Sequence, residues 1–481
     1  MQPLRWNCSS WQWFTAAALL TSISLSLTAC RVGPNYRPPA MPMPPAYRGA
    51  GADAATSQSS IGAGDWWQVF QEPQLEALEK QTDAANTDIR IAVTRVDEAA
   101  ASTGYARSYM FPTISGQPAA GRMREAQDRP NNGTTNGQAA TYNDFQLPLV
   151  FDFEIDAWGR VRRTVEAARA TQQATADDFR FVRLTAEASV AIDYYQLREK
   201  DQELRVLDST IADLQNSLDL TTELFHHGLS GELQVAQAKT LLDQTRASEQ
   251  TLSTGRAQSE HAIAVLIGRT AESFSIPAQT DAPPPPDIPI GLPSDLLKRR
   301  PDVLEAERNV AAASAEIGVA KAAYFPRLSL SGLSGFESTN AASLLRWQNS
   351  IASLGAGAVA PIFTAGRVHA GVQQATDAYE GSLARYEKTV LTSYTEVEDQ
   401  LSALEFLTAQ SRLQAVAVED AMRSEQLAND RFKAGLVSYL DVVTAEQAVL
   451  FNQRTAAQIA GERMVATVVL IKALGGGWTR S

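Results

Sequence analysis

The chain has 481 residues, with 42 Lys and Arg against 54 Asp and Glu and a formal net charge of −12. This acidic balance, with no clustered basic stretch, excludes a nucleic-acid partner, because phosphate binding requires a clustered basic face. Pro is crowded into three places and long stretches contain neither Gly nor Pro, which favours long helices over a series of compact domains.

The first thirty residues have the pattern of a secretory signal. Arg5 supplies a positive charge, an apolar stretch follows, and small residues precede Cys30. The ending Leu-Thr-Ala-Cys resembles a bacterial lipobox, in which residues 1–29 are removed and Cys30 carries a covalent lipid. Arg31 stands where an Asp would retain a lipoprotein in the inner membrane, so the resemblance implies sorting to the outer membrane. The alternative is an ordinary signal followed by a chance Cys.

Residues 30–64 are rich in Pro and predict an extended tether behind the lipid. Cys8 lies in the expected signal, so the mature chain keeps one Cys and no internal disulfide is predicted. No run of about 20 apolar residues follows the signal, which predicts no membrane-spanning helix. If the protein crosses a membrane, it must do so with strands.

The second half of the sequence repeats the first. The segment 225–229 (FHHGL) matches 432–436 (FKAGL), 207 residues later. Upstream, 111–112 (FP) matches 325–326 (FP), 214 residues later. Shared landmarks in the same order indicate an internal duplication. The change in spacing predicts seven extra residues in the first half, within the loop 122–140.

Each half is predicted to contain a helix, two strands and two long helices, the first helix running from about Gln74 to Tyr109. The predicted segments are a signal at 1–29, a lipid-anchored tether at 30–64, a first repeat at 65–275, a Pro-rich linker at 276–298, a second repeat at 299–474 and a tail at 475–481. The strands are expected at 111–121, 142–156, 325–336 and 351–363. The long helices are expected at 159–227, 232–268, 367–433 and 438–474.

The long helices carry the stronger signal. Apolar residues in the first one recur at intervals of seven, with a second line offset by three: Leu197, Leu204, Ile211, Leu218 and Phe225, then Leu207 and Leu214. This is a coiled-coil seam. The helix would be about 100 Å long at 1.5 Å per residue. The seam of the helix at 367–433 is poorer, because Ser411 and Glu425 occupy positions expected to be apolar.

Four strands cannot span a membrane alone, because their open edges would leave unpaired backbone groups in hydrocarbon. Other copies of the chain must therefore complete the sheet. Two copies would give eight strands and three would give twelve. An eight-stranded barrel is filled by its own side chains, so a channel needs three or more copies.

Seven short motifs in order carry a resemblance to a known family: Cys30-Arg31-Val32-Gly33-Pro34-Asn35-Tyr36, Trp66-Trp67, Arg299-Arg300-Pro301-Asp302-Val303, Tyr324-Phe325-Pro326, Pro361-Ile362-Phe363 with Gly366-Arg367, Ala434-Gly435, and Tyr439-Leu440-Asp441-Val442. The chain resembles outer-membrane factors of the TolC type, and within them the lipid-anchored OprM-like branch. The resemblance covers essentially the whole mature chain.

This resemblance implies a mixed α and β, internally duplicated fold. As a homotrimer, the chain would form a 12-stranded outer-membrane β-barrel continuous with a long α-helical coiled-coil barrel in the periplasm. The implied function is the exit duct of a tripartite efflux system that exports small molecules. The implied partners are outer-membrane lipid, a periplasmic adaptor and a proton-driven inner-membrane transporter. No cofactor is expected beyond the covalent lipid on Cys30.

The two turns between the long helices are the candidate functional sites. Gly228 and Leu229 in the first turn, and Gly435 and Leu436 in the second, are candidates for contacting the adaptor at the periplasmic end. Glu232 and Asp441 follow these turns and are candidates for an acidic ring at the closed aperture. Asp441 falls where TolC-like proteins carry an aperture aspartate. An acid near a helix start is also favoured by the helix dipole alone, so both interpretations of Asp441 stay open.

Other functions fit the sequence less well. A protein-secretion channel would have the same architecture, whereas a non-transporting coiled-coil lipoprotein would not need strand pairs at matching points of both halves. An enzyme is not expected, because the sequence lacks the G-x-S-x-G, P-loop and H-E-x-x-H motifs. Adjacent side chains such as His226 and His227 point apart on a helix, so no metal site is predicted.

Overall fold

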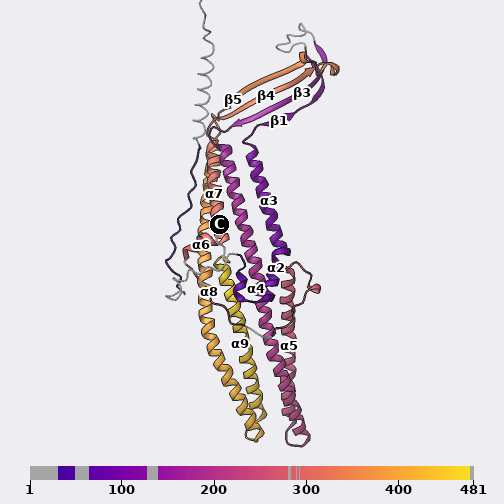
Figure 1. Cartoon of the computed structure of the whole chain (residues 1–481), viewed down its shortest axis with the longest axis vertical. Helices are drawn as coiled ribbons and strands as arrows, with labels where there is room; N and C mark the ends of the chain where they lie inside the picture. Colours follow the sequence, from indigo (N-terminus) through magenta and orange to yellow (C-terminus); the bar gives the residue numbers. More distant parts are fainter. Residues whose placement is uncertain are drawn as a thin grey trace, which may run out of the picture. The chain divides into compact units, whose positions relative to one another are not determined.

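The computed structural model describes residues 31–48, 64–126, 139–279, 283–288, 290–291 and 293–476 (Figure 1). The expected signal at 1–29, the expected lipidation site Cys30 and part of the tether lie outside the described residues. The described residues form two compact units: those of unit 1 fall in the ranges 1–39, 97–174 and 307–385, and those of unit 2 in 40–96, 175–306 and 386–481. Each unit takes segments from both halves of the sequence, so the two repeats are not separate domains.

The helices follow the duplication residue by residue. The matching pairs are α3 (Thr87–Ser108) with α7 (Pro301–Ala322), 22 residues each; α4 (Arg160–His226) with α8 (Arg367–Lys433), 67 each; and α5 (Glu232–Leu266) with α9 (Tyr439–Ala473), 35 each. The first pair keeps the spacing of 214 residues and the other two keep 207. The long helices stand within one or two residues of the predicted ranges.

The helix predicted from Gln74 to Tyr109 is wrong as a single element. The structure has α2 (Pro73–Ala85) and α3, separated at Asn86. The Asn86 Oδ1 accepts hydrogen bonds from the backbone N–H groups of Asp88 and Ile89, at 2.8 and 3.1 Å, so Asn86 caps the start of α3. The shorter elements are η2 (Trp66–Phe70), η3 (Ala271–Ser273), η4 (Pro293–Asp295), α6 (Leu296–Arg299), η5 (Ala341–Ser343) and η6 (Trp347–Asn349).

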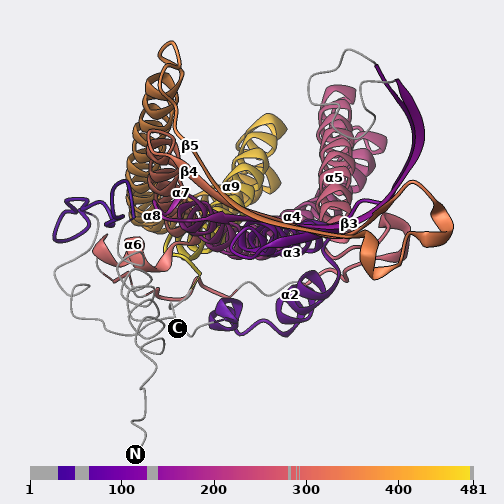
Figure 2. The same ribbon diagram turned by 90° about the horizontal axis from the view of Figure 1, so that it is seen from above.

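Unit 1 contains one antiparallel sheet, whose strands run side by side as a curved layer (Figure 1; Figure 2). Its strands are β1 (Thr113–Gly116), β2 (Ala119–Glu125), β3 (Ala140–Ile155), β4 (Arg327–Ser338) and β5 (Ser350–Val359). The order is β1-β3-β4-β5, with β2 also paired to β3. The outer edges of β1, β2 and β5 pair with no other strand of the described residues.

Two strand predictions need correction, and Pro explains both. The strand expected at 111–121 is divided into β1 and β2 around Pro118, which has no N–H to donate to the ladder. The strand expected at 351–363 ends at Val359, two residues before Pro361. The strands expected at 142–156 and 325–336 are observed as β3 and β4, shifted by up to two residues.

The register gives the sheet one apolar and one polar face. Leu149, Phe151 and Phe153 of β3 alternate with Asp152 and Glu154. Because directly paired residues share a face, the apolar side continues into neighbouring strands through Ile114, Leu328, Leu330, Phe336 and Leu354. Several of these side chains are exposed in the single chain, Ile114 and Leu354 by 70% and 77%. None of the described helices is long and apolar enough to cross a membrane.

The main hydrophobic core belongs to unit 2. Trp66 and Trp67 of η2 are almost fully buried there, packed among residues of α2, α4, α5 and α9. The Trp66 Nε1 donates to the Glu187 carboxylate at 2.9 Å. In the second half of α4, Leu207 and Leu214, which the sequence analysis placed on the second heptad line, are buried, and Thr221 continues this line. The first heptad line is less buried at its end, where Phe225 is 39% exposed.

We predict that Gly335→Ala weakens the pairing of β3 with β4. A Cβ at Gly335 would lie 2.6 Å from Pro148 Cα and would also contact the carbonyl oxygen of Leu147, both backbone atoms. Overpacking of this kind costs about 1–3 kcal/mol. The denaturation temperature and the yield of folded protein should fall. Gly121→Ala in β2 is the matched control, because a Cβ there has no atom within 4 Å. Equal stability of the two variants would contradict the prediction.

Candidate functional site

The two turns between the long helices have the same backbone structure. After α4, Gly228 has φ of 74°, and the N–H of Leu229 donates to the carbonyl of Leu224 at 2.8 Å. After α8, Gly435 has φ of 70°, and the N–H of Leu436 donates to the carbonyl of Arg431 at 2.9 Å. Each is a Schellman ending, which needs a left-handed residue and therefore favours Gly. Both turns lie at the same end of unit 2 (Figure 1).

Each turn exposes a large apolar side chain directly after its glycine. Leu229 is 76% exposed and Leu436 is 74% exposed, and the first turns of α5 and α9 add exposed Leu233 and Leu440. We call these four residues, two at each turn, the turn leucines. Exposed large apolar side chains that lie close together at a turn are typical of a protein contact surface.

A small core holds the two helical hairpins together behind the turns. Leu214, Leu242 and Val442 belong to one buried cluster that joins α4, α5 and α9, and Phe432 of α8 packs against it. The hydroxyl groups of Tyr439 and Ser217 lie 2.9 Å apart, which joins α9 to α4 through a hydrogen bond. The positions of the turns are therefore coupled by packing.

Asp441 is the third residue of α9 and closes a capping box with Ser438, the N-cap. Its Oδ2 accepts hydrogen bonds from the backbone N–H of Ser438 at 2.9 Å and from the Ser438 hydroxyl at 2.7 Å. The residue is exposed. This is the local capping role that the sequence left open, and it is compatible with an aperture role, which stays a prediction.

Glu232, unlike Asp441, does not accept the hydrogen bond that caps its helix. It is an exposed residue in the first turn of α5. In α5 the backbone N–H of Gly231 donates to the side-chain oxygen of Gln234 at 3.1 Å. The sequence analysis gave Glu232 and Asp441 the same candidate role, but only Asp441 takes part in capping its helix.

Sequence reasoning missed an acidic cluster inside unit 2, made of Asp213, Glu425 and Glu446 from α4, α8 and α9. Burial, together with the charges of Glu425 and Asp213, raises the pKa of Glu446 to about 7. Burial and the charge of Asp213 also raise the pKa of Glu425. The Glu446 Oε2 is buried and accepts no hydrogen bond from a described residue. Glu425 was visible in the sequence as a break in the apolar seam.

No side-chain cluster in the described part of the chain, the acidic cluster included, has the ligands of a metal site. His226 contacts the ring of Phe225, with ring centroids 6.0 Å apart. Arg300, in one of the sequence motifs, is buried and pairs with Asp302 and Glu396, at 2.6 and 2.7 Å. Its role is to hold the start of α7 against α8.

We predict that unit 2 becomes more stable as Glu446 is protonated. A raised pKa means that stability is fully present below the unfolded value near 4.5 and is lost as the pH rises through about 7. Glu446→Gln should therefore raise the denaturation temperature at pH 8 and have little effect near pH 4.5. Glu419→Gln, at an exposed position of α8, is the control. A pH dependence that is the same in both variants would refute this assignment.

Nearly the whole chain is similar to outer-membrane proteins of efflux systems. The profile of the family described as outer membrane efflux protein matches residues 78–269 and 292–476. The toluene efflux pump outer membrane protein TtgI of Pseudomonas putida is 31% identical over 469 residues, covering 95% of this chain and 97% of that protein. The cation efflux system protein CusC of Escherichia coli is 28% identical, covering 95% and 97%.

Solved structures agree with this result. The outer-membrane channel OprN superimposes with a TM-score of 0.84 at 29% identity, covering 93% of this chain and all of that one. The transmembrane channel CusC gives 0.83 at 27% identity with the same coverage. The fold, the duplication and these matches together show that the chain belongs to the outer membrane efflux protein family, as an outer-membrane channel of an efflux system.

Proposed function

We propose that three copies of this chain form the exit duct of a tripartite efflux system, and that this duct exports small molecules across the outer membrane. The observation that carries the proposal is the sheet of unit 1, which has one apolar face and two open edges. The family assignment supports the same function. The duct performs no chemical step, and it requires no cofactor other than a covalent lipid.

The apolar face of the sheet fits contact with lipid. Side chains such as Ile114, Leu149 and Leu354 are exposed in the single chain, where water would otherwise cover them. At about 25 cal/mol per Å² of apolar surface removed from water, transfer of this face to lipid is favourable. The opposite face carries Asp152 and Glu154, which suits a water-filled lumen.

The open edges determine how the copies associate. The β5 edge of one copy would pair with the β1 and β2 edge of the next. Repeating this contact around a ring leaves no unpaired edge. Since β1 and β2 together form one edge, each chain contributes four strand positions, and three copies give twelve.

The helical hairpins would form the periplasmic part of the duct. At 1.5 Å per residue, the 67 residues of α4 and of α8 each extend about 100 Å. The turn leucines would bind a periplasmic adaptor, which connects the duct to a proton-driven inner-membrane transporter. Buried apolar anchors supply most of the affinity in such contacts.

A lipid on Cys30 would add a second attachment to the outer membrane. Cys30 is followed by residues 31–48, a largely extended segment of the described chain. Acyl chains contribute roughly 0.8 kcal/mol per buried CH₂, so the anchor would keep each copy at the membrane before the barrel closes.

The cargo is proposed only as a class. Relatives are named for the efflux of toluene and of cations. These names favour small molecules over the polypeptide cargo of a secretion channel. A non-transporting lipoprotein is disfavoured by the sheet, which a coiled-coil tether would not need.

The aperture proposal predicts a cation-preferring channel whose preference depends on Asp441. In planar bilayers, Asp441→Asn should lower the cation preference, because it removes three negative charges from the narrow end while keeping an acceptor for the cap. Asp441→Ala should also open the pore more often and cost about 0.3–1 kcal/mol of helix stability, because it removes an acid from the start of α9. Asp420→Asn, at an exposed position of α8, is the control.

Two results would count against these proposals separately. If Asp441→Asn conducts like the unaltered protein, Asp441 is a structural cap and not a gate. If the unaltered protein forms no channel at all, the duct proposal itself fails.

A further inference from the structure

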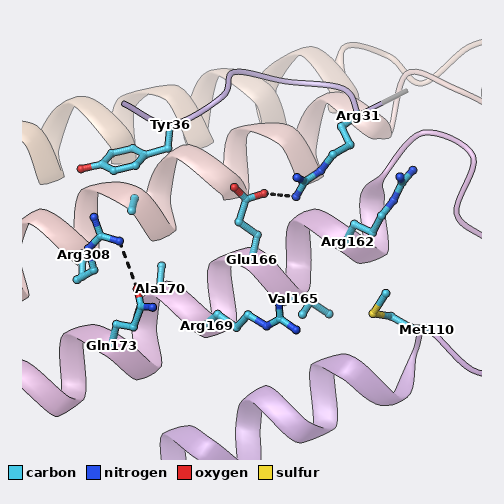
Figure 3. A pocket seen from close by; sticks show the side chains of 11 residues that line it. Arg31, Tyr36, Met110, Arg162, Val165, Glu166, Arg169, Ala170, Gln173 and Arg308 are labelled. Carbon is cyan, nitrogen blue, oxygen red and sulfur yellow. Dashed lines mark hydrogen bonds and ion pairs between the residues drawn. The ribbon is translucent and has the colours of Figure 1, made fainter. Parts of the chain in front are cut away.

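Unit 1 contains a basic cavity of about 570 Å³ between the N-terminal strap, residues 31–39, and the helices α4 and α7 (Figure 3). Four arginines line it, contributed by the strap, by α4 and by α7: Arg31, Arg162, Arg169 and Arg308. The single acidic residue in its lining is Glu166. None of these residues is explained by the duct proposal.

The strap is fixed in place, so the cavity is preformed. The buried Arg163 donates to the carbonyl oxygens of Val32 and Gly33, at 3.2 and 3.3 Å, and to the Asn35 side chain at 3.2 Å. The Val32 N–H donates to the Trp158 carbonyl at 3.1 Å. Gly33 also approaches α7 closely, since a Cβ there would lie 2.5 Å from Gly318 Cα.

The acid cannot neutralise the cavity. The Glu166 Oε2 is shared by Arg31 at 2.6 Å and by Arg163 at 2.9 Å. Arg162 pairs outside the cavity lining with Asp156, and Arg308 pairs with Glu307.

Among the residues that the structure describes, Arg169 has no partner that neutralises its charge. Its side chain is exposed, and it forms no ion pair or hydrogen bond with the residues that the structure describes. In Figure 3 it projects from α4 beside Glu166 and Val165, on the same helix face that lines the cavity.

The lining matches a phosphate joined to an apolar group. A guanidinium group binds two phosphate oxygens at once, through a planar fork of N–H donors. Beside these donors, Met110, Val165 and Ala170 provide apolar surface. The Tyr36 ring lies under Arg308, with the guanidinium carbon 5.6 Å from the ring centroid, which holds that cation in place.

The surroundings indicate a membrane source for this phosphate. Near Met110 in the sequence, three exposed aromatic side chains lie in the last turn of α3 and just beyond it: Tyr105, Tyr109 and Phe111. The Tyr109 hydroxyl donates to the Tyr105 hydroxyl at 2.8 Å. Exposed aromatic rings of this kind settle at the level of lipid headgroups. The strap also begins at Arg31, directly after Cys30.

We propose that this cavity binds the phosphodiester headgroup of an anionic phospholipid from the periplasmic leaflet of the outer membrane. The inference rests on the proposed function, because the lipid on Cys30 would hold the cavity at that leaflet. Arg169 and Arg31 bind the phosphate, and the apolar lining receives the glycerol end of the acyl chains. The bound lipid would fasten the strap to α4 and α7.

Native mass spectrometry of the detergent-purified, acylated protein tests this assignment. The protein is titrated separately with phosphatidylglycerol, phosphatidylethanolamine and inorganic phosphate. Phosphatidylglycerol should bind best, and Arg169→Gln should weaken it roughly tenfold, the loss expected for one charge-assisted pair. Arg169→Lys should fall between, because it keeps the charge and loses the fork. Arg205→Gln, an exposed position of the same helix in unit 2, should bind like the unaltered protein.

Three outcomes would overturn the proposal. If all variants bind phosphatidylglycerol with equal affinity, the lipid does not bind at Arg169. If phosphatidylglycerol and phosphatidylethanolamine bind with equal affinity, the cavity does not select an anionic headgroup. Binding of inorganic phosphate as tight as that of phosphatidylglycerol assigns the cavity to a free anion. The same spectra give the number of chains in the complex and the mass of the covalent lipid on each chain. A result that contradicts the proposed trimer or the proposed lipid on Cys30 is therefore distinguished from a result that contradicts headgroup binding in the cavity.

Discussion

The structure depends on one constraint, the need of backbone N–H and C=O groups for hydrogen-bond partners where water is absent. In the described part of the chain, β3 and β4 are paired on both sides, whereas β1, β2 and β5 each leave an edge open. An unpaired group in hydrocarbon costs several kcal/mol. The apolar face directs the sheet into lipid, and the open edges then require further copies of the chain. Assembly and membrane insertion are therefore two consequences of the same pattern of hydrogen bonds.

The duplication gives both helical hairpins the same geometry. Left-handed glycines recur at equivalent places: Gly159 and Gly366 before the long helices, Gly228 and Gly435 at the turns, and Gly268 and Gly475 after the shorter helices. Identical lengths of 67 and 35 residues bring the two turns to one end of unit 2. The copies differ mainly in their side chains, where Asp441 caps its helix and Glu232 does not. Repeated backbone with divergent side chains leaves exposed leucines at both turns, while an acid accepts the capping hydrogen bond only at the second.

Local patterns predicted most of the secondary structure, because the period of the helices and the left-handed glycines are encoded in short stretches of sequence. The helix break at Asn86 and the strand break at Pro118 each depend on one residue within a pattern that is otherwise continuous, so the pattern alone did not predict them. The acidic cluster around Glu446 and the basic cavity around Arg169 join residues more than a hundred positions apart. A short stretch of sequence does not predict which distant residues will contact it. Glu425 was the exception, since a charged residue in an apolar seam indicates a polar neighbour across the helices.

The most direct test of the account is disulfide formation between the outer edges of two copies. Ile114→Cys in β1 is combined in turn with Ala352→Cys, Leu354→Cys and Ala356→Cys in β5, all on the apolar face, so that several registers are sampled. The mature chain adds no competing thiol if Cys30 is acylated. Paired edges should give a covalently closed trimer with at least one combination, because a disulfide needs Cβ atoms roughly 3.5–4.5 Å apart. Cross-linked products no larger than a dimer, or none in any combination, would contradict the closed ring of three copies.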